Sequence, residues 1–438
     1  MTTLLAQALF ESTRGVAPTL FGLRADDYWV MATAVVCAVA CAVLGCFLVL
    51  RRLSLLGDAI SHAILPGLAL AFIVTGSRDI VPMLIGAMVV GLLTAAMTSA
   101  LARMGRVPED AAMGVVFSSL FALGVLLISQ VAHNVDLDPG CVLYGLIEFT
   151  PLDKVLVLGF ELPRAFGVLS VVMVINLALI TVFYKELKIV SFDPYLATTM
   201  GINATLVHYG LMAAVAGTTV ASFEAVGSIL VVAMLIAPAA SAQLLTDRLA
   251  RMLWISALLA VIAAVVGYLL ALYWNTSVAG MMSVVAGGEF AAAVFLAPNH
   301  GLVSKALRQS LLALRIRRED ILGTLYRQQE AGAGGGLGHR GDGLIGTLAI
   351  FLLRRAGHVE GAKGARSLST SGQAKAGHII RSHRLWETYL SRKVGLPTDH
   401  VHDPSERMEH FITKGLEQDL SQEFEGGLDP QGKRIPPP

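Results

Sequence analysis

Long apolar stretches fill the first two thirds of the chain and restrict what it can fold into. Of its 438 residues, 55% are hydrophobic and 15% charged, and the apolar runs stop near Pro298. A helix needs about 20 apolar residues to cross a bilayer. Nine stretches approach that length, at residues 28–50, 53–74, 81–102, 111–131, 166–184, 205–222, 225–245, 252–273 and 278–297. The sequence predicts a polytopic all-α membrane protein with 8–9 transmembrane helices, eight if 205–222 does not cross.

Basic residues fix the orientation of these spans. They gather in alternate loops, at Arg51-Arg52, Arg103/Arg106, Lys185/Lys188, Arg248/Arg251 and Lys305/Arg308. The positive-inside rule places such loops in the cytoplasm. The C-terminal part after the last span is therefore expected in the cytoplasm, and the long loop around 132–165 outside. Residues 1–27 are interpreted as a peripheral segment and residues 28–300 as the membrane domain.

Asp58 and His62 lie within the second apolar stretch, four residues apart. Positions i and i+4 share one face of a helix. Ionisable groups at membrane depth are costly and commonly face a bundle interior or an ion path. A carboxylate and an imidazole on one face form a ligand pair for a divalent cation. The alternative is a buried hydrogen-bonded pair that only holds helices together. Glu224 and Glu289, the other carboxylates near membrane depth, have no assigned role.

One inside loop, from Tyr184 to Gly201, is polar and amphipathic. A short helix can begin at Asp193, with Pro194 as its first residue, and end at Gly201. Such a cytoplasmic helix can dock a separate ATPase subunit, although an ordinary loop helix has the same pattern.

Several motifs, in order and at matching spacing, resemble the manganese/zinc/iron permeases of ABC transporters. They are Leu53–Gly67, Glu109-Asp110, Ser191–Gly201, Val226–Ala239, Trp274–Met282 and Ala297–Gly301. The resemblance implies a permease in the plasma (inner) membrane of a bacterium. It also implies three partners: an extracytoplasmic metal-binding protein, an ATPase gripping the 191–201 loop, and a second permease subunit, identical or different.

Residue roles follow from the same resemblance. Asp58 and His62 would coordinate the metal ion in passage. The ATPase would contact a set within the loop, namely Phe192, Asp193, Pro194, Ala197 and Gly201. No GxxxxGK[ST] phosphate-binding motif occurs in the chain, so the permease is expected not to be an enzyme and to rely on a separate ATPase.

The C-terminal part has its own pattern. It contains 8 of the 11 histidines. Helix, glycine-rich gap (331–343), apolar helix (344–355), hairpin and helix follow one another, which predicts a winged-helix-like domain at 301–375. Residues 376–438 are expected to form a helical metal-binding, dimerisation-like domain.

Imidazoles and carboxylates recur at helical spacing in this last segment. His383 and Glu387 are four residues apart, and His402, Glu406 and His410 repeat at i, i+4 and i+8, with Glu409 beside them. Three or more such groups on one helix face make a plausible divalent-metal site. The alternative is a solvated charged helix in which the histidines occur by chance.

The segment Arg381–His410 and the ending Asp429–Pro436 resemble the iron- and manganese-dependent repressors of the diphtheria-toxin-repressor family. The resemblance implies metal ligands at His383, His402, Glu406, Glu409 and His410, with Glu387 in an ancillary set and Asp320 as a first-helix ligand. An oxygen and nitrogen ligand set suits Mn²⁺ or Fe²⁺. A second first-helix ligand would fall at Gly323 and is absent.

The DNA-binding half departs from that family. Its recognition helix corresponds to the apolar run Leu344–Leu353, which offers no Arg, Asn or Gln to read base edges. We therefore expect poor DNA binding and a metal-sensing role. Two alternatives remain: a membrane-tethered or released metal-dependent transcriptional regulator, and a permease for a metal chelate. The sequence does not decide between Mn²⁺, Fe²⁺ and Zn²⁺ as the transported ion.

Overall fold

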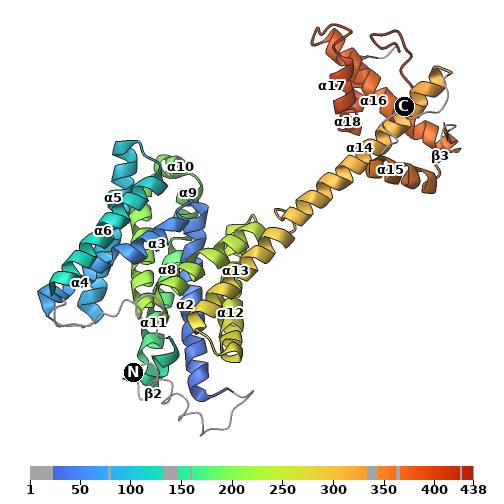
Figure 1. Ribbon diagram of the computed structural model, residues 1–438. Coiled ribbons are helices and arrows are strands. Elements are labelled where there is room, and N and C mark those ends of the chain that lie inside the picture. Colours follow the sequence, from blue (N-terminus) through green and yellow to red (C-terminus); the bar gives the residue numbers. More distant parts are fainter. Residues whose placement is uncertain are drawn as a thin grey trace. The chain divides into compact units, whose positions relative to one another are not determined.

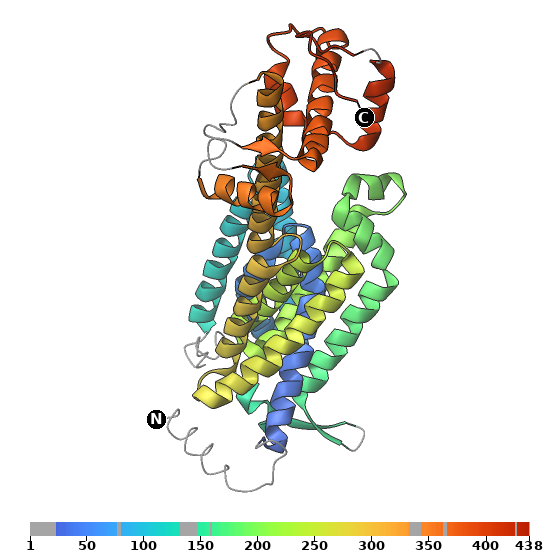
Figure 2. The same ribbon diagram turned by 90° about the vertical axis from the view of Figure 1, so that its right-hand side faces the viewer.

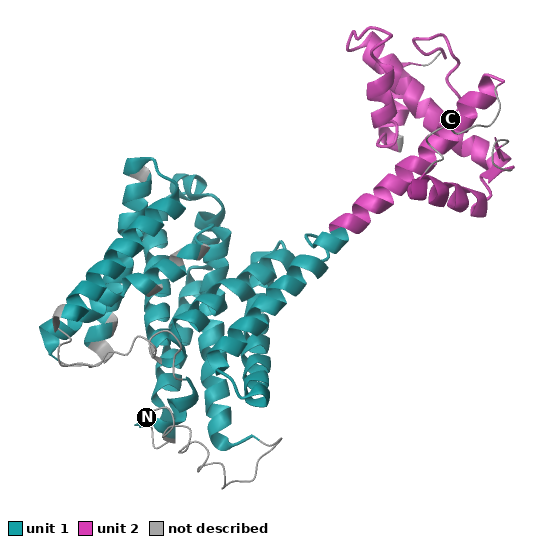
Figure 3. Ribbon diagram, viewed as in Figure 1, with its two compact units in different colours: residues 1–304 teal, residues 305–438 magenta. Residues whose placement is uncertain are grey.

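The computed structural model describes residues 23–76, 80–131, 147–157, 160–332, 343–361, 366–424 and 427–437. The chain divides into two compact units, residues 1–304 and 305–438 (Figure 3). Most of residues 1–27, the loop at 132–146 and the glycine-rich gap at 333–342 lie outside the described residues.

The first unit is a bundle of long apolar helices (Figure 1). Within the described residues, nine helical stretches are long and apolar enough to span a membrane, as the sequence predicts. They lie in α2 (Ala25–Leu50), α3 (Ser54–Ala63) with α4 (Leu65–Thr75), α5 (Ile80–Gly105), α6 (Glu109–Val131), α8 (Arg164–Val182), α11 (Ala204–Leu245), α12 (Leu249–Trp274) and α13 (Val278–Leu296).

Two of these helices are interrupted. The second predicted span consists of α3 and α4, and Pro66, which has no backbone N–H, lies at the start of α4. The predicted stretches 205–222 and 225–245 form one long α11, broken at Gly227 with φ 76° and ψ 167°. Only glycine adopts that conformation without strain, so two spans follow one another without a loop.

Helix α2 is the most buried element and packs against α8, α11 and α12. Its Gly45 lies so close to α11 that a Cβ would stand 1.8 Å from the carbonyl oxygen of Leu235. Gly67 of α4 and Gly86 of α5 make a similar crossing, since a Cβ on Gly67 would lie 2.4 Å from the carbonyl oxygen of Gly86. Small residues allow such backbone contact in membranes, where no hydrophobic force draws helices together.

Between α6 and α8 lie a 3₁₀ helix, η4 (Ile147–Leu152), and the antiparallel hairpin of β1 (Lys154–Val157) and β2 (Phe160–Pro163). Glu148 of η4 accepts a hydrogen bond at 3.1 Å from the backbone N–H of Val278 at the start of α13. The connection between α8 and α11 contains α9 (Tyr184–Phe192) and α10 (Pro194–Thr199).

The second unit is mainly helical (Figure 2). It comprises most of α14 (Leu302–Glu330), α15 (Gly343–Arg355), the ribbon of β3 (Val359–Glu360) and β4 (Ser367–Leu368), α16 (Thr370–Arg392), α17 (His402–Met408) and α18 (Lys414–Glu423). Ile321, Leu325, Leu353, Val359 and Ala376 lie in one buried core. The predicted order of helices and hairpin is therefore present.

Candidate metal sites and coupling helix

Asp58 and His62 face each other on α3, with 3.5 Å between Oδ1 and Nε2. Their side chains are 44% and 39% exposed in the single chain, and the imidazole lies against Phe117 and Phe121 of α6. Within the described residues, neither group hydrogen-bonds to another helix. The pair is therefore accessible, and in the described residues no hydrogen bond from it joins α3 to another helix.

Other side chains of α3 hold the helix in place. Ile60 points away from the pair and is buried, and Ala59 and Ala63 are buried on its flanks.

The helix after Asp193 forms as the sequence predicts. The Asp193 carboxylate accepts hydrogen bonds at 3.0 Å from the backbone N–H groups of Tyr195 and Leu196, and Pro194 is the first helical residue. Gly201 follows with φ +81°. An N-cap, a proline at the first position and a glycine after the end specify a short helix without help from packing.

Helix α10 and the residues that flank it have one buried side chain among several exposed apolar ones. Ala197 is fully buried, whereas Phe192, Tyr195, Leu196 and Met200 are 62%, 85%, 51% and 60% exposed. Exposed apolar clusters of this kind are typical of surfaces that contact another protein or a membrane. Sequence reasoning missed Tyr195, Leu196 and Met200, although large apolar residues in a polar loop are a usable signal.

Arg51 joins the end of α2 to this region. Its Nε donates to the Ser191 hydroxyl at 3.2 Å, and its Nη1 lies 3.3 Å from Nδ1 of His208 on α11. Sequence reasoning used Arg51 only to orient the membrane domain. Its side chain also connects α9, which precedes the exposed apolar cluster, to two spans.

In the second unit, His383, Glu387 and His402 form one candidate metal group. Nε2 of His383 lies 3.0 Å from Oε1 of Glu387 and 3.1 Å from Nδ1 of His402. Glu387 is 1% exposed, so α16 delivers a buried carboxylate, and His402 comes from the start of α17.

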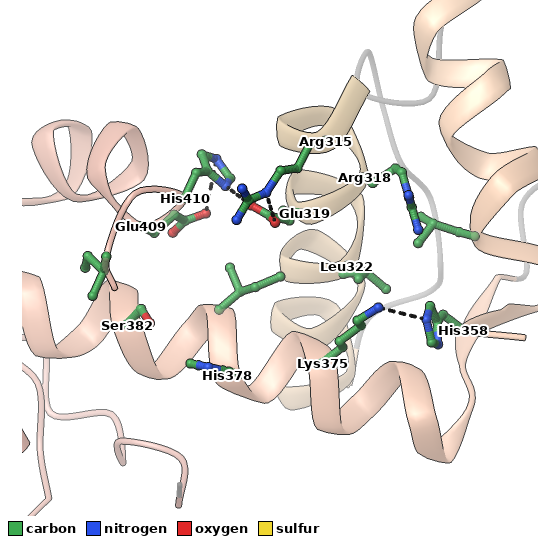
Figure 4. Close-up of a pocket in the computed structure, with 13 residues that line it drawn as sticks. Arg315, Arg318, Glu319, Leu322, His358, Lys375, His378, Ser382, Glu409 and His410 are labelled. Atoms are coloured by element: carbon green, nitrogen blue, oxygen red, sulfur yellow. Dashed lines mark hydrogen bonds and ion pairs between the residues drawn. The ribbon is translucent and has the colours of Figure 1, made fainter. Parts of the chain in front are cut away.

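Asp320, Glu409 and His410 form the other group. Nε2 of His410 lies 3.1 Å from Oδ1 of Asp320, and its Nδ1 lies 2.7 Å from Oε2 of Glu319 (Figure 4). Sequence reasoning missed Glu319. Nothing local identifies it, because its partner lies 91 residues later in the chain.

His383 connects the two groups. Its Nδ1 approaches Oε2 of Glu409 to 2.6 Å, yet both buried atoms lack a hydrogen bond of good geometry. The potential ligand atoms within each group lie within 4.8 Å of one another. Metal ions with ligand distances of about 2.0–2.6 Å bridge atoms at such separations. The residues present therefore fit a divalent ion.

Charge compensation supports the same interpretation. Burial opposes protonation of His383 and His410, but hydrogen bonds to carboxylates outweigh it, so the pKa of His383 is raised and that of His410 is raised to about 9. Burial would raise the pKa of Glu387, but hydrogen bonds with His383 and His402 lower it overall. Protonated His383 and His410 thus compensate the negative charge of the clustered carboxylates. A metal ion that binds would displace protons from its histidine ligands.

The prediction that His402, Glu406 and His410 lie in a row on one helix face is wrong. Helix α17 ends at Met408, so His410 follows in a turn and joins the Asp320 group, while His402 joins His383. Glu406 belongs to neither group. Gly323, where a further ligand would fall, is buried and packs near Ile380.

Helix α15 occupies the place of a recognition helix and exposes apolar side chains. Leu344 is 91% exposed and Phe351 57%, with Ile345 and Leu348 about half exposed. The exposed arginines of this helix, Arg354 and Arg355, lie only in its last turn. An apolar surface cannot read base edges, so poor DNA binding remains the expectation.

Arg384 of α16 contacts segments of the second unit that lie far apart in the sequence. Its side chain is 4% exposed and lies 2.5 Å from Glu330 at the end of α14 and 3.4 Å from Asp429. It also donates to the backbone carbonyl of Arg434. This network holds the Asp429–Pro436 ending against α16.

Replacing Arg384 by alanine is expected to destabilise the second unit by roughly 3–5 kcal/mol, because two carboxylates lose their buried partner. Hydrogen exchange of full-length protein would show faster exchange across α14 and α16. Lys393→Ala removes the exposed ion pair with Glu423 and should have little effect. Equal effects of the two changes would contradict this role.

A bundle of membrane helices with an accessible carboxylate–imidazole pair and a capped loop helix has the features of a transport permease. Residues 28–297 match the family model described as the ABC 3 transport family, and the chain belongs to this family. Residues 369–437 match the model described as the iron dependent repressor, metal binding and dimerisation domain.

Curated relatives cover the membrane domain. The manganese transport system membrane protein MntD of Bacillus subtilis is 49% identical over 64% of this chain and 96% of its own length. The zinc transport system membrane protein TroD of Treponema pallidum is 43% identical over 65% and 78%. A solved structure titled PsaBC from Streptococcus pneumoniae in complex with Fab has a TM-score of 0.53 at 34% identity, covering 62% of this chain and 92% of that one.

Proposed function

We propose that this chain is the permease subunit of an ATP-driven importer of Mn²⁺, with a cytoplasmic tail that senses the metal. The accessible Asp58/His62 pair in a membrane span carries the proposal. A dication leaving water needs oxygen or nitrogen ligands at membrane depth. Manganese appears in the names of several relatives, and a carboxylate–imidazole pair suits that ion.

Three partners complete the importer. An ATPase subunit docks on the knob formed by Phe192, Tyr195, Leu196 and Met200. An extracytoplasmic binding protein delivers the metal, and a second permease subunit brings a second ligand pair to the path. With the basic loops inside, the C-terminal unit faces the cytoplasm.

The two groups joined by His383 give the tail its role as a sensor. When bound, a divalent ion would replace protons as the positive charge among the carboxylates held by α14, α16 and α17. Because those helices also carry the core of the unit, occupancy changes its packing. An effector shifts transport only if it binds two states unequally; inhibition at high cytoplasmic metal is the expected direction.

Selectivity tests the transport proposal. A strain lacking its own importers would express the chain with its ATPase and binding protein, and growth would be scored with Mn²⁺, Fe²⁺ and Zn²⁺ as separate limiting metals. Rescue by manganese alone is expected. Rescue by a chelated metal but not by the free ions would favour the chelate permease.

Tyr195→Ala and Pro194→Ala are each expected to reduce co-purification of the ATPase by about tenfold. Tyr195→Ala removes most of an exposed contact surface, and Pro194→Ala removes the proline that favours the start of the helix. Lys185→Ala, on exposed α9 surface, serves as the control. Undiminished pairing in a Pro194→Ala/Tyr195→Ala double variant would place the docking surface elsewhere.

The tail is expected not to protect DNA from nuclease, with or without Mn²⁺, because α15 exposes mainly apolar side chains and has arginines only in its last turn. The footprint would use a fragment covering residues 300–438 and the promoter region upstream of its own gene. A specific, metal-dependent footprint would revive the transcriptional alternative.

A further inference from the structure

A cavity of about 300 Å³ opens in the second unit, beside the candidate metal groups (Figure 4). Its walls come from α14, the end of α15, the turn before β3, α16 and the turn after α17. The residues at its two ends differ in charge and in their partners.

One end belongs to the site already described. There Glu319 is held by Arg315 at 3.0 Å and by His410 at 2.7 Å, and Glu409 lies beside His410. The charges at this end are paired with one another.

The other end is formed by Arg318, Lys375 and His358. Nζ of Lys375 lies 3.2 Å from Nε2 of His358, whose Nδ1 lies 3.1 Å from the Ser371 hydroxyl. Burial, Lys375 and Arg318 all lower the pKa of His358, so the imidazole is neutral at neutral pH and accepts from the lysine.

These cations lack a counter-charge. Within the described residues, neither Arg318 nor Lys375 has a carboxylate partner, and Nε of Arg318 is buried without any hydrogen bond. An unpaired buried donor on a charged group is destabilising unless a bound group satisfies it. Guanidinium and ammonium groups turned into a cavity are the usual partners of phosphate and carboxylate oxygens.

We propose that Arg318 and Lys375, with His358, bind a small anion that carries two or more negative charges on phosphate or carboxylate oxygens. Arg318 supplies the buried donor, and Lys375, which is exposed at the rim, supplies a second charge. The cavity is large enough for inorganic phosphate with a small organic remainder or for a tricarboxylate.

The anion would lie in the same cavity as Glu319 and His410. It would connect α14, the turn before β3 and α16, and a metal ion in the neighbouring group would attract it. The site therefore offers a second input to the tail, separate from the metal.

Metal-free, full-length protein in detergent would be titrated with inorganic phosphate, and separately with citrate, by isothermal calorimetry. Saturable binding of at least one anion is expected, and Arg318→Gln should weaken it about tenfold or more, as for a lost charge-assisted contact. Arg318→Lys keeps the charge and should retain part of the affinity. Arg317→Gln removes the same charge from the preceding residue of α14. Because Arg317 does not line the cavity, this change should alter affinity less than about twofold.

Phosphate binding without citrate binding would identify a phosphate-bearing ligand, and the reverse a polycarboxylate. The absence of saturable binding by both anions, or an equal effect of Arg317→Gln and Arg318→Gln, would overturn the proposal. Because no metal and no transport enter the measurement, its failure would leave the importer function untouched.

Discussion

Replacing Asp58 or His62 by alanine is expected to lower Mn²⁺ uptake at least about 100-fold. Changes to groups that only support a metal ligand cost roughly 10–100-fold, and here a ligand itself is lost where water cannot replace it at low cost. The exposed side chains of this pair suggest that the protein should still fold. Uptake of radiolabelled Mn²⁺ by cells with equal amounts of membrane-inserted protein would measure the effect.

The chain contains a matched control. His300 and Asp247 form another histidine–aspartate pair, at 2.9 Å, outside the membrane spans. Alanine at either position should leave uptake near the unchanged level. Normal uptake by the Asp58 or His62 variant would refute a coordinating role and return the pair to a structural one.

Replacing His383 by alanine is expected to weaken metal binding by the tail by about 100-fold, because His383 contacts Glu387 and His402 in its own group and Glu409 in the other. Titration would use full-length protein carrying Asp58→Ala, which removes the path site, with Mn²⁺ followed by electron paramagnetic resonance.

His378→Ala provides the comparison, since His378 lies on the same helix but is half exposed and contacts Glu417. It should bind Mn²⁺ as the parent does. If the His383 variant retained the parent's affinity, the clustered carboxylates and imidazoles would be a structural ion-pair network.

The membrane spans could be predicted from sequence because they depend on a local property, the length of an apolar stretch. The side on which each loop lies stays a prediction from lysine and arginine. The helix after Asp193 could be predicted equally well, since its cap, its proline and its terminal glycine lie within nine residues. The joining of two predicted spans into one helix, α11, could not be predicted, because the conformation of Gly227 depends on its surroundings.

The tail shows where local patterns stop being informative. Spacing placed His402, Glu406 and His410 on one face, but α17 is too short to contain all three. The Glu319–His410 and Arg384–Glu330 contacts join segments 91 and 54 residues apart, and no helical period encodes such pairings. For Asp320 only the family resemblance, and not spacing, predicted a place beside the other ligands, and the structure places its Oδ1 3.1 Å from Nε2 of His410.

We infer that this permease moves Mn²⁺ and that its own tail senses the ion. Both parts can be tested together in vesicles with the ATPase and the cytoplasmic tail outside, and with binding protein and radiolabelled Mn²⁺ inside. ATP-driven release of label would be measured as unlabelled Mn²⁺ is raised outside, for the parent and for His383→Ala. We expect ATP-dependent transport by both proteins, inhibited by outside Mn²⁺ in the parent and resistant to it in the variant. Absence of ATP-dependent transport, or equal inhibition of both proteins, would refute the inference.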